Sequence, residues 1–136
     1  MKGIKLIDIP LKHDSRGNLA VVEKLKELPF DPKRIFWIFG VPDGETRASH
    51  AHTTQQQFIV AVSGSFTVET DNGKEKVETF MDSPDKGLLI DSGIWITLKN
   101  FSSDGICLAI APDSYKKEEY INDYKEFLAR KKNSDI

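Results

Sequence analysis

Two histidines separated by one residue, His50 and His52, are the residues of this chain whose types and spacing could do chemistry. Side chains two residues apart in a β-strand point to the same face, so this spacing presents two imidazoles side by side. An imidazole can bind a divalent metal ion, and it can also take up and return a proton near neutral pH. Arg47 and Gln57 flank the pair and could share its pocket. The pattern favours a metal site or an acid–base site over two purely structural histidines.

The metal interpretation starts from the spacing of the segment that runs from Gly44 through the two histidines and Gln57 to Gly64. This spacing resembles the first motif of metal-binding cupins, a family that normally has Glu where Gln57 stands and a third His near the end of a second motif. The corresponding second stretch here, residues 87–100, contains no histidine. Two imidazoles and an amide oxygen are a poor ligand set for a catalytic divalent ion. We therefore expect a cupin fold with no metal and no other cofactor.

Proton transfer by two neighbouring imidazoles suits one reaction class in particular. Moving a carbonyl between adjacent carbons through an enediol removes a proton from one carbon and delivers a proton to the next. A positioned acid or base typically contributes on the order of 100- to 10,000-fold to the rate of such a step. His50 and His52 therefore predict metal-free isomerisation by acid–base catalysis.

Composition limits the other possibilities. The chain has 136 residues, a length that suits a single hydrophobic core. We therefore expect one domain that spans residues 1–136. Charged residues make up 29%, the net charge is −2 and neither sign forms a run, which argues against nucleic acid or an anionic membrane as a partner. No apolar run is long enough to span a bilayer and no signal-like segment begins the chain, so we expect a cytoplasmic protein. Cys107, the single cysteine, lies in an alternating apolar segment and is expected to be a buried hydrophobe.

Short alternating apolar segments separated by Gly, Pro and Asn turns predict strands along most of the chain. Residues 12–18 are expected to form a loop, and the turn Asp71-Asn72-Gly73 predicts a β-hairpin. The pattern is typical of an all-β, antiparallel jelly-roll (cupin) barrel with a short C-terminal helix. Besides the histidine segment, the expected strands are residues 4–11, 19–23, 34–39, 58–62, 65–70, 74–80, 87–90, 95–98 and 106–111.

The C-terminal helix is predicted from side chains that recur at three- and four-residue spacing. These are Tyr120, Tyr124, Phe127 and Leu128. Asn122 or Asp123 is expected to cap the helix, and residues 131–136 are expected to form a frayed polar tail.

Short motifs along nearly the whole chain occur in an order that is fairly specific in combination. They are Asp14-Ser15-Arg16-Gly17, Pro29-Phe30, Lys33-Arg34-Ile35, Arg47, His50-Ala51-His52, Gln57, Gly64-Ser65, Gly87-Leu88, Trp95, Phe101-Ser102-Ser103-Asp104, Tyr115, Tyr120-Ile121, Asp123-Tyr124 and Phe127. This combination resembles the sugar 3,4-ketoisomerases. The resemblance implies a metal-free jelly-roll cupin that moves the ketone of a dTDP-4-keto-6-deoxyhexose from C4 to C3, ahead of amino-sugar formation for surface polysaccharides, and that works as a homodimer.

The resemblance also implies roles for individual residues. His50 and His52 would be the proton-transfer pair, Arg16 would lie near the sugar and the diphosphate, and Arg47 and Gln57 would line the same pocket. The planar donor fork of Arg suits a diphosphate or paired hydroxyls. Two further residues have less specific patterns. Trp95 would stack on the base or the sugar or belong to the core, and Arg34 is expected to be a charge at a strand edge.

Seven residues at five places in the chain depart from the family's usual pattern. Thr53 replaces a Lys directly after the His-Ala-His triplet, and Ala48 replaces a Gly after the matching arginine. The other departures are Phe36-Trp37 for a Tyr-Tyr pair, Ile96 for His or another polar residue, and Lys116-Lys117 for acidic residues. We expect these changes to alter sugar recognition while the histidine pair keeps the reaction class.

Two alternatives remain open at this point. A nucleotide-sugar 3,5-epimerase of related cupin fold also uses a His base, but it typically needs a carboxylate-supported His and a Tyr acid, and the tyrosines here are concentrated near the C-terminus. A sugar-nucleotide-binding cupin without catalysis would explain the lost polar residues.

Overall fold

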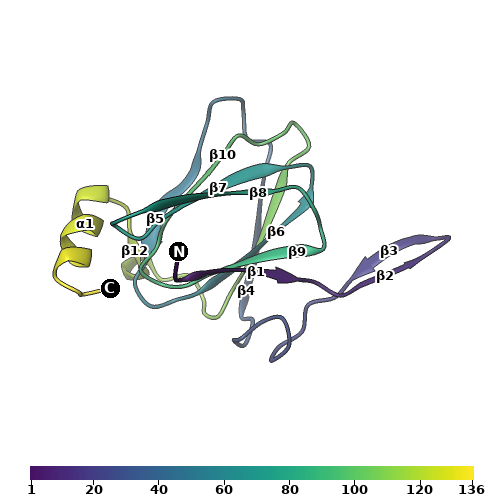
Figure 1. Cartoon of the computed structure of the whole chain (residues 1–136), viewed down its shortest axis with the longest axis horizontal. Coiled ribbons are helices and arrows are strands. Elements are labelled where there is room, and N and C mark those ends of the chain that lie inside the picture. The colour runs from purple at the N-terminus through teal and green to yellow at the C-terminus, as the bar shows by residue number, and fades with distance from the viewer.

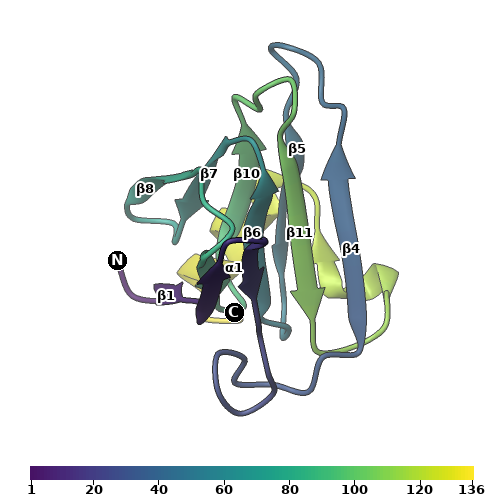
Figure 2. The ribbon, with the colours of Figure 1, turned by 90° about the vertical axis from the view of Figure 1, so that its right-hand side faces the viewer.

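Two five-stranded antiparallel sheets face each other in the computed structural model, which describes all 136 residues (Figures 1 and 2). We call them the first and the second sheet. The first sheet has the order β1 (Ile4–Asp8), β9 (Lys86–Ile90), β6 (Gln57–Ser63), β11 (Ile106–Ala111) and β4 (Arg34–Phe39). The second sheet has the order β12 (Tyr120–Ile121), β5 (Arg47–His52), β10 (Trp95–Lys99), β7 (Phe66–Asp71) and β8 (Lys76–Met81). The predicted all-β jelly roll is confirmed.

The main core lies between the two sheets and consists of 13 buried side chains. The inward positions alternate along each strand, as in β11, where Cys107 and Ala109 belong to this core. Burial raises the pKa of the Cys107 thiol to about 12. The thiol is thus a buried hydrophobe, as the sequence predicts.

No helix in the structure has the length and apolar character needed to cross a membrane.

A two-stranded hairpin, β2 (Leu11–Asp14) and β3 (Gly17–Ala20), projects from the body of the molecule (Figure 1). The predicted strand 4–11, loop 12–18 and strand 19–23 are therefore wrong in their boundaries. β1 ends at Asp8, and the expected loop forms most of the hairpin. Every residue of the two strands is exposed, so no buried apolar face marks these strands in the sequence.

The C-terminal helix α1 runs from Tyr124 to Lys132, and Asp123 caps it by accepting a hydrogen bond from the Lys125 N–H at 2.9 Å. The helix is confirmed, but it begins later than the spacing of apolar residues predicts. Tyr120 lies outside it, in strand β12. The tail expected at 131–136 is also partly wrong, because Lys131 and Lys132 belong to the helix and Ile136 packs against a buried cluster.

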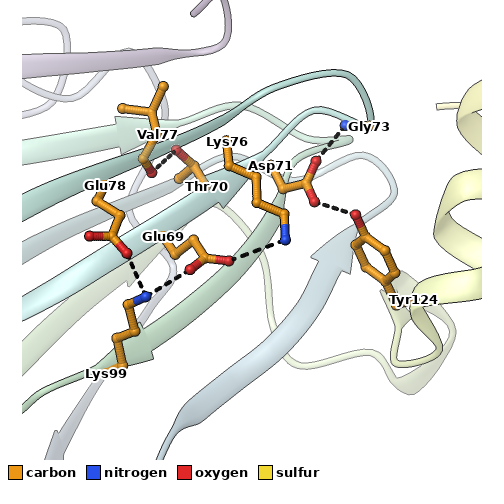
Figure 3. A network of polar contacts seen from close by, with 9 residues as sticks. All are labelled: Glu69, Thr70, Asp71, Gly73, Lys76, Val77, Glu78, Lys99 and Tyr124. Atoms are coloured by element: carbon orange, nitrogen blue, oxygen red, sulfur yellow. Dashed lines mark hydrogen bonds and ion pairs between the residues drawn. The ribbon is translucent and has the colours of Figure 1, made fainter.

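Helix α1 is attached to the second sheet by a polar network and an apolar cluster. Tyr124 donates a hydrogen bond to one oxygen of the buried Asp71 carboxylate, whose other oxygen accepts from the Gly73 N–H at 2.7 Å (Figure 3). Farther along the same sheet, Lys99 lies between Glu69 and Glu78 (Figure 3). The apolar cluster joins Ala51, Trp95, Ile121 and Phe127. These contacts fix the end of the chain beside β5.

Candidate active site

The two histidines lie side by side on β5, with ring centroids 5.1 Å apart and ring planes at 86°. A β-bulge precedes them. Strand β10 pairs Ile96 with His50 and Thr97 with Ala48, which leaves Ser49 without a partner. The backbone is left-handed at Ala48 (φ 67°) and Ser49 (φ 57°). The bulge therefore sets the direction of the strand just before the histidine pair.

Tyr120 completes an aromatic group with the two histidines. Strand β12 pairs with β5 so that Tyr120 is opposite His52 in register. The tyrosine ring centroid lies 4.8 Å from that of His50 and 4.6 Å from that of His52. A tyrosine near the C-terminus thus contacts the catalytic candidates, which the sequence argument against a Tyr acid did not foresee.

Arg34 reaches the same place from the first sheet, where it begins β4. Its Nη2 donates a hydrogen bond to the Tyr120 hydroxyl oxygen at 3.1 Å. Its guanidinium carbon lies 5.2 Å from the ring centroid of Phe36 and 5.8 Å from that of Tyr115. Arg34 begins an edge strand, as expected, but its side chain points inward instead of lying in solvent. Arg34 alternates with Phe36 and Ile38, which pack against the core, so the strand period already placed it on the inward face.

A cavity of about 260 Å³ lies between the sheets at this point. Its polar lining comes from both sheets and from β12, and apolar side chains form most of the remaining wall. Gln57 is buried, and its side-chain nitrogen has no hydrogen-bond partner in the protein. The polar lining residues are Arg34, Arg47, His50, Gln57 and Tyr120. The structure therefore brings Arg47, Gln57 and His50 together, as the sequence predicts, whereas His52 is buried beside His50 and does not line the cavity.

Both histidines are held in the neutral form. Burial lowers the pKa of His50 to about 4, with a smaller contribution from the positive charge of Arg34. Burial likewise lowers the pKa of His52 to about 4, helped by His50 and Arg34 and opposed by Glu119. Neither ring nitrogen of His52 has a hydrogen-bond partner in the protein. Neutral imidazoles in a partly apolar cavity can act as bases at neutral pH.

Glu119 fixes the turn that directly follows the pair. Its carboxylate accepts hydrogen bonds from the N–H groups of Thr54 (2.6 Å) and Gln55 (2.7 Å) and from the hydroxyls of Thr53 (3.0 Å) and Thr54 (2.8 Å). Burial opposes ionisation of this carboxyl, but these hydrogen bonds hold its pKa below the usual range of a glutamate. Sequence reasoning missed Glu119, because its partners are more than 60 residues away in the chain.

Two residues that were expected to bind the substrate, Arg16 and Trp95, lie away from the cavity. Arg16 is at the tip of the β2–β3 hairpin, where its side chain is 88% exposed and pairs with Asp14 at 2.6 Å. Trp95 packs against Tyr124 and Phe127 with centroid distances of 5.2 and 5.6 Å. Trp95 is opposite Ala51 in register, so it faces the helix while its neighbour Ile96 lines the cavity. The structure does not bring either side chain to the cavity of its own chain.

The histidine pair has no third ligand that would complete a metal site. No group of three or more His, Cys, Asp or Glu side chains lies close enough together to hold a metal ion. The Glu119 carboxylate lies beside the turn that follows β5, and it already accepts four hydrogen bonds from that turn. The arrangement is suited to moving protons beside the cavity between the sheets.

Comparison with known proteins gives the family. The family model described as "FdtA: WxcM-like, C-terminal" matches residues 2–132. The chain belongs to the FdtA family. One curated relative, a TDP-4-oxo-6-deoxy-alpha-D-glucose-3,4-oxoisomerase from Aneurinibacillus thermoaerophilus, is 37% identical over 123 residues, which cover 90% of this chain and 88% of the relative.

Solved structures agree with this placement in the FdtA family. The TDP-quinovose 3,4-ketoisomerase WlaRB from Campylobacter jejuni has a TM-score of 0.90 at 35% identity and covers 95% of this chain and 99% of its own. The TDP-fucose-3,4-ketoisomerase WlaRA from the same organism has a TM-score of 0.91 at 34% identity, with 98% of both chains covered. The resemblance to sugar 3,4-ketoisomerases, an isomerase family, is confirmed.

The epimerase alternative has weaker support from the same comparisons. A 4-keto-6-deoxy sugar epimerase from Streptomyces spheroides, NovW, has a TM-score of 0.75 at 14% identity and covers 88% of this chain and 68% of its own. Identity at that level shows a shared fold and no more. The relatives with 34–37% identity are 3,4-ketoisomerases, so they favour the ketoisomerase over the epimerase.

Proposed function

We propose that this chain moves the ketone of a dTDP-4-keto-6-deoxyhexose from C4 to C3 through an enediol, with His50 and His52 as the proton-transfer pair. The observation that carries the proposal is the pair of neutral imidazoles, 5.1 Å apart, beside a cavity between the sheets. The names of the curated and structural relatives support the same substrate class. Because burial lowers the pKa of both imidazoles to about 4, both are unprotonated at neutral pH and each has a ring nitrogen that can take a proton.

Substrate binding in this proposal uses the polar residues that line the cavity. Arg47 lies at its exposed side and would bind an oxygen of the substrate, since a guanidinium offers several fixed donors. Gln57 lies deeper, and its unpartnered amide N–H group would donate to a sugar oxygen. Trp95 would act only through the packing of α1 against β5.

A homodimer completes the proposal. The outward face of β4, an edge strand, exposes three large apolar side chains, Ile35 (57%), Trp37 (58%) and Phe39 (66%). A second copy is the occupant that we propose for this face, since contiguous exposed apolar surface favours association.

A cytoplasmic location is consistent with the single, unpaired Cys107.

Arg16 has a place in this dimer. It lies on a hairpin that projects from the body, so we propose that it meets the diphosphate in the site of the partner copy. Mixed dimers of Arg16→Ala and His50→Asn subunits test this role. If Arg16 acts in the partner's site, one of the two sites in a mixed dimer is intact and activity returns to about half. If Arg16 acts in its own chain or not at all, mixing restores nothing beyond the activity of the parent variants.

The function is tested by incubation with dTDP-4-keto-6-deoxyglucose in deuterated buffer, followed by NMR of the sugar. Isomerisation gives a ketone at C3 and deuterium at C4. A parallel incubation in H2O keeps a proton at C4, and the coupling pattern of that proton reports the product configuration. We expect His50→Asn and His52→Asn to lower the rate on the order of 100-fold or more. The matched control is His13→Asn, because His13 is exposed on the hairpin.

Three outcomes would contradict the proposal. Deuterium at C5 would identify an epimerase, saturable binding without exchange would identify a binding protein, and loss of activity with a chelator would restore the metal interpretation. Full activity of His50→Asn or of His52→Asn would refute the roles given to the pair.

A further inference from the structure

Tyr120 is a polar residue of the cavity that has no role in the mechanism described so far. Its ring contacts both histidines, and its hydroxyl oxygen accepts a hydrogen bond from Arg34 Nη2 at 3.1 Å. A phenol oxygen can accept one hydrogen bond while its own hydrogen is donated to another group. The contact with Arg34 therefore leaves the O–H hydrogen available to an oxygen of a bound substrate.

The position of this phenol is fixed from several sides. Strand β12 pairs with β5, and the Thr53 N–H donates to the Glu119 carbonyl at 2.9 Å next to Tyr120. The Glu119 carboxylate is bonded to the same turn. A catalytic proton donor needs such support, because its geometry must be held close to the productive one.

We propose that Tyr120 is a third proton-transfer group of the site, which gives its hydroxyl proton to the ketone oxygen while the histidine pair removes a proton from the neighbouring carbon. Arg34 is then a positioning residue that acts through Tyr120. This inference rests on the isomerase function proposed above and deepens it by assigning the proton transfers at oxygen, which the two histidines leave open.

The proposed steps balance without an oxidant or reductant. An imidazole takes the proton from C3, the C3–H electron pair forms the C3=C4 bond, and the carbonyl pair moves to O4, which takes the Tyr120 proton. The phenolate then takes the proton of the C3 hydroxyl, whose O–H pair forms the new C3=O bond. The C3=C4 pair takes up at C4 the proton held by the histidine pair. Tyr120 and both imidazoles end in their starting states.

The charges around the cavity fit this division of work. Neutral imidazoles accept protons but are poor proton donors to an oxyanion, so a separate donor is needed at the start of the reaction. The guanidinium of Arg34 carries a permanent charge and stabilises the phenolate that forms beside it. The charged and titratable groups around the ring are Arg34 on β4, Arg47, His50 and His52 on β5, and Tyr115 and Glu119 before β12.

The test is steady-state kinetics of Tyr120→Phe with dTDP-4-keto-6-deoxyglucose. Phenylalanine keeps the ring beside the two histidines and removes only the hydroxyl, so we expect kcat to fall on the order of 100-fold while KM changes less than threefold. Tyr115→Phe is the matched control, because Tyr115 is exposed and contacts the same arginine and the Tyr120 ring. We expect it to keep wild-type kcat.

A second measurement separates proton transfer from a structural role and does not depend on how Tyr120→Phe folds. Replacing Tyr120 by 3,5-difluorotyrosine makes the phenol more acidic and keeps its hydrogen bond, so we expect the basic limb of the kcat–pH profile to move to lower pH. Arg34→Met removes the hydrogen bond that positions the phenol, so we expect it to lower kcat more than it changes KM. An unmoved basic limb in the difluorotyrosine protein would overturn the inference.

The inference and the proposed function fail in different ways. Wild-type protein that does not isomerise the substrate would refute the function itself. Wild-type activity together with at least one third of the wild-type kcat in Tyr120→Phe would refute only the assignment of Tyr120.

Discussion

Thr53, the residue directly after His52, donates its hydroxyl hydrogen to the Glu119 carboxylate at 3.0 Å. This contact joins the end of β5 to the segment before β12. Thr53 departs from the family pattern, in which a lysine is usual at this position, and the contact shows what the threonine side chain binds. The same carboxylate receives both amide hydrogens of the turn, from Thr54 and Gln55. Glu119 therefore holds together the two segments that present His52 and Tyr120.

Removal of the Glu119 carboxylate should destabilise the protein. Glu119→Ala leaves the N–H groups of Thr54 and Gln55 without an acceptor, and we expect a loss of about 2–4 kcal/mol in the free energy of unfolding. Glu119→Gln keeps one acceptor oxygen and should lose about 1 kcal/mol. Urea denaturation at fixed protein concentration measures both. The neighbouring Glu118 is exposed, so Glu118→Ala is the control, and equal losses in Glu118→Ala and Glu119→Ala would refute this role.

Stability should fall as the pH is lowered from 6.5 to 5. The folded-state pKa values of His50 and His52 lie near 4 because of burial, whereas an unfolded histidine titrates near 6.5. Within this window the unfolded chain binds more protons than the folded chain, so acid favours unfolding. We expect the pair to cause a loss of about 1–3 kcal/mol across the window.

The measurement is urea denaturation at several pH values for wild type and for His50→Gln/His52→Gln. The double variant should show a much smaller change between pH 6.5 and 5, while His13→Asn should keep the wild-type change because His13 is exposed. A double variant with the wild-type pH dependence would show that other groups cause the effect.

The sequence predicted the fold best where strands alternate between a buried and an exposed face. Strands β4 and β11 were predicted with their observed bounds, 34–39 and 106–111. The β2–β3 hairpin was missed because it has no buried face, so nothing in its composition distinguishes strand from loop. Tyr120 was assigned to the helix because its spacing from Tyr124 fits a helical face, whereas long-range pairing with His52 places it in β12.

The site was predictable only in its local part. The spacing of His50 and His52 implied a shared face because strand geometry is local. Arg34 and Tyr120 come from a different sheet and from the chain end, and only the folded topology brings them together. The aromatic side chain of Trp95 is the only reason in the sequence to expect that it binds the ligand. Its register opposite Ala51, on the face that packs against α1, is a long-range property.

The Tyr124–Asp71 contact should contribute to the attachment of helix α1. Asp71 is 2% exposed, and loss of the tyrosine hydroxyl would leave one of its oxygens without that donor. Hydrogen bonds to charged groups contribute about 1.5–3 kcal/mol, so Tyr124→Phe should lower the free energy of unfolding by about that amount. Hydrogen exchange should become faster in α1 and β12 before it changes in the first sheet. Tyr115→Phe is the control, and equal exchange in the two variants would exclude a role of this contact.

Ala48→Gly should stabilise the protein. Ala48 has φ 67°, in the left-handed region where a side chain on Cβ costs about 1 kcal/mol and glycine is unstrained. The family usually has glycine at this position, which the bulge before the histidines now explains in physical terms. The greater freedom of glycine in the unfolded chain offsets part of the relieved strain. We therefore expect a net gain of about 0.5–1 kcal/mol in the free energy of unfolding.

The matched control for this gain is Ala51→Gly on the same strand. Ala51 is fully buried in the cluster beneath α1 and lies beyond the bulge, so its replacement should destabilise the protein. Thermal and urea unfolding of both variants at one protein concentration give the comparison. If Ala48→Gly lost as much stability as Ala51→Gly, the strain assigned to the bulge would be wrong, and the alanine at position 48 would have to contribute through its contact with the core.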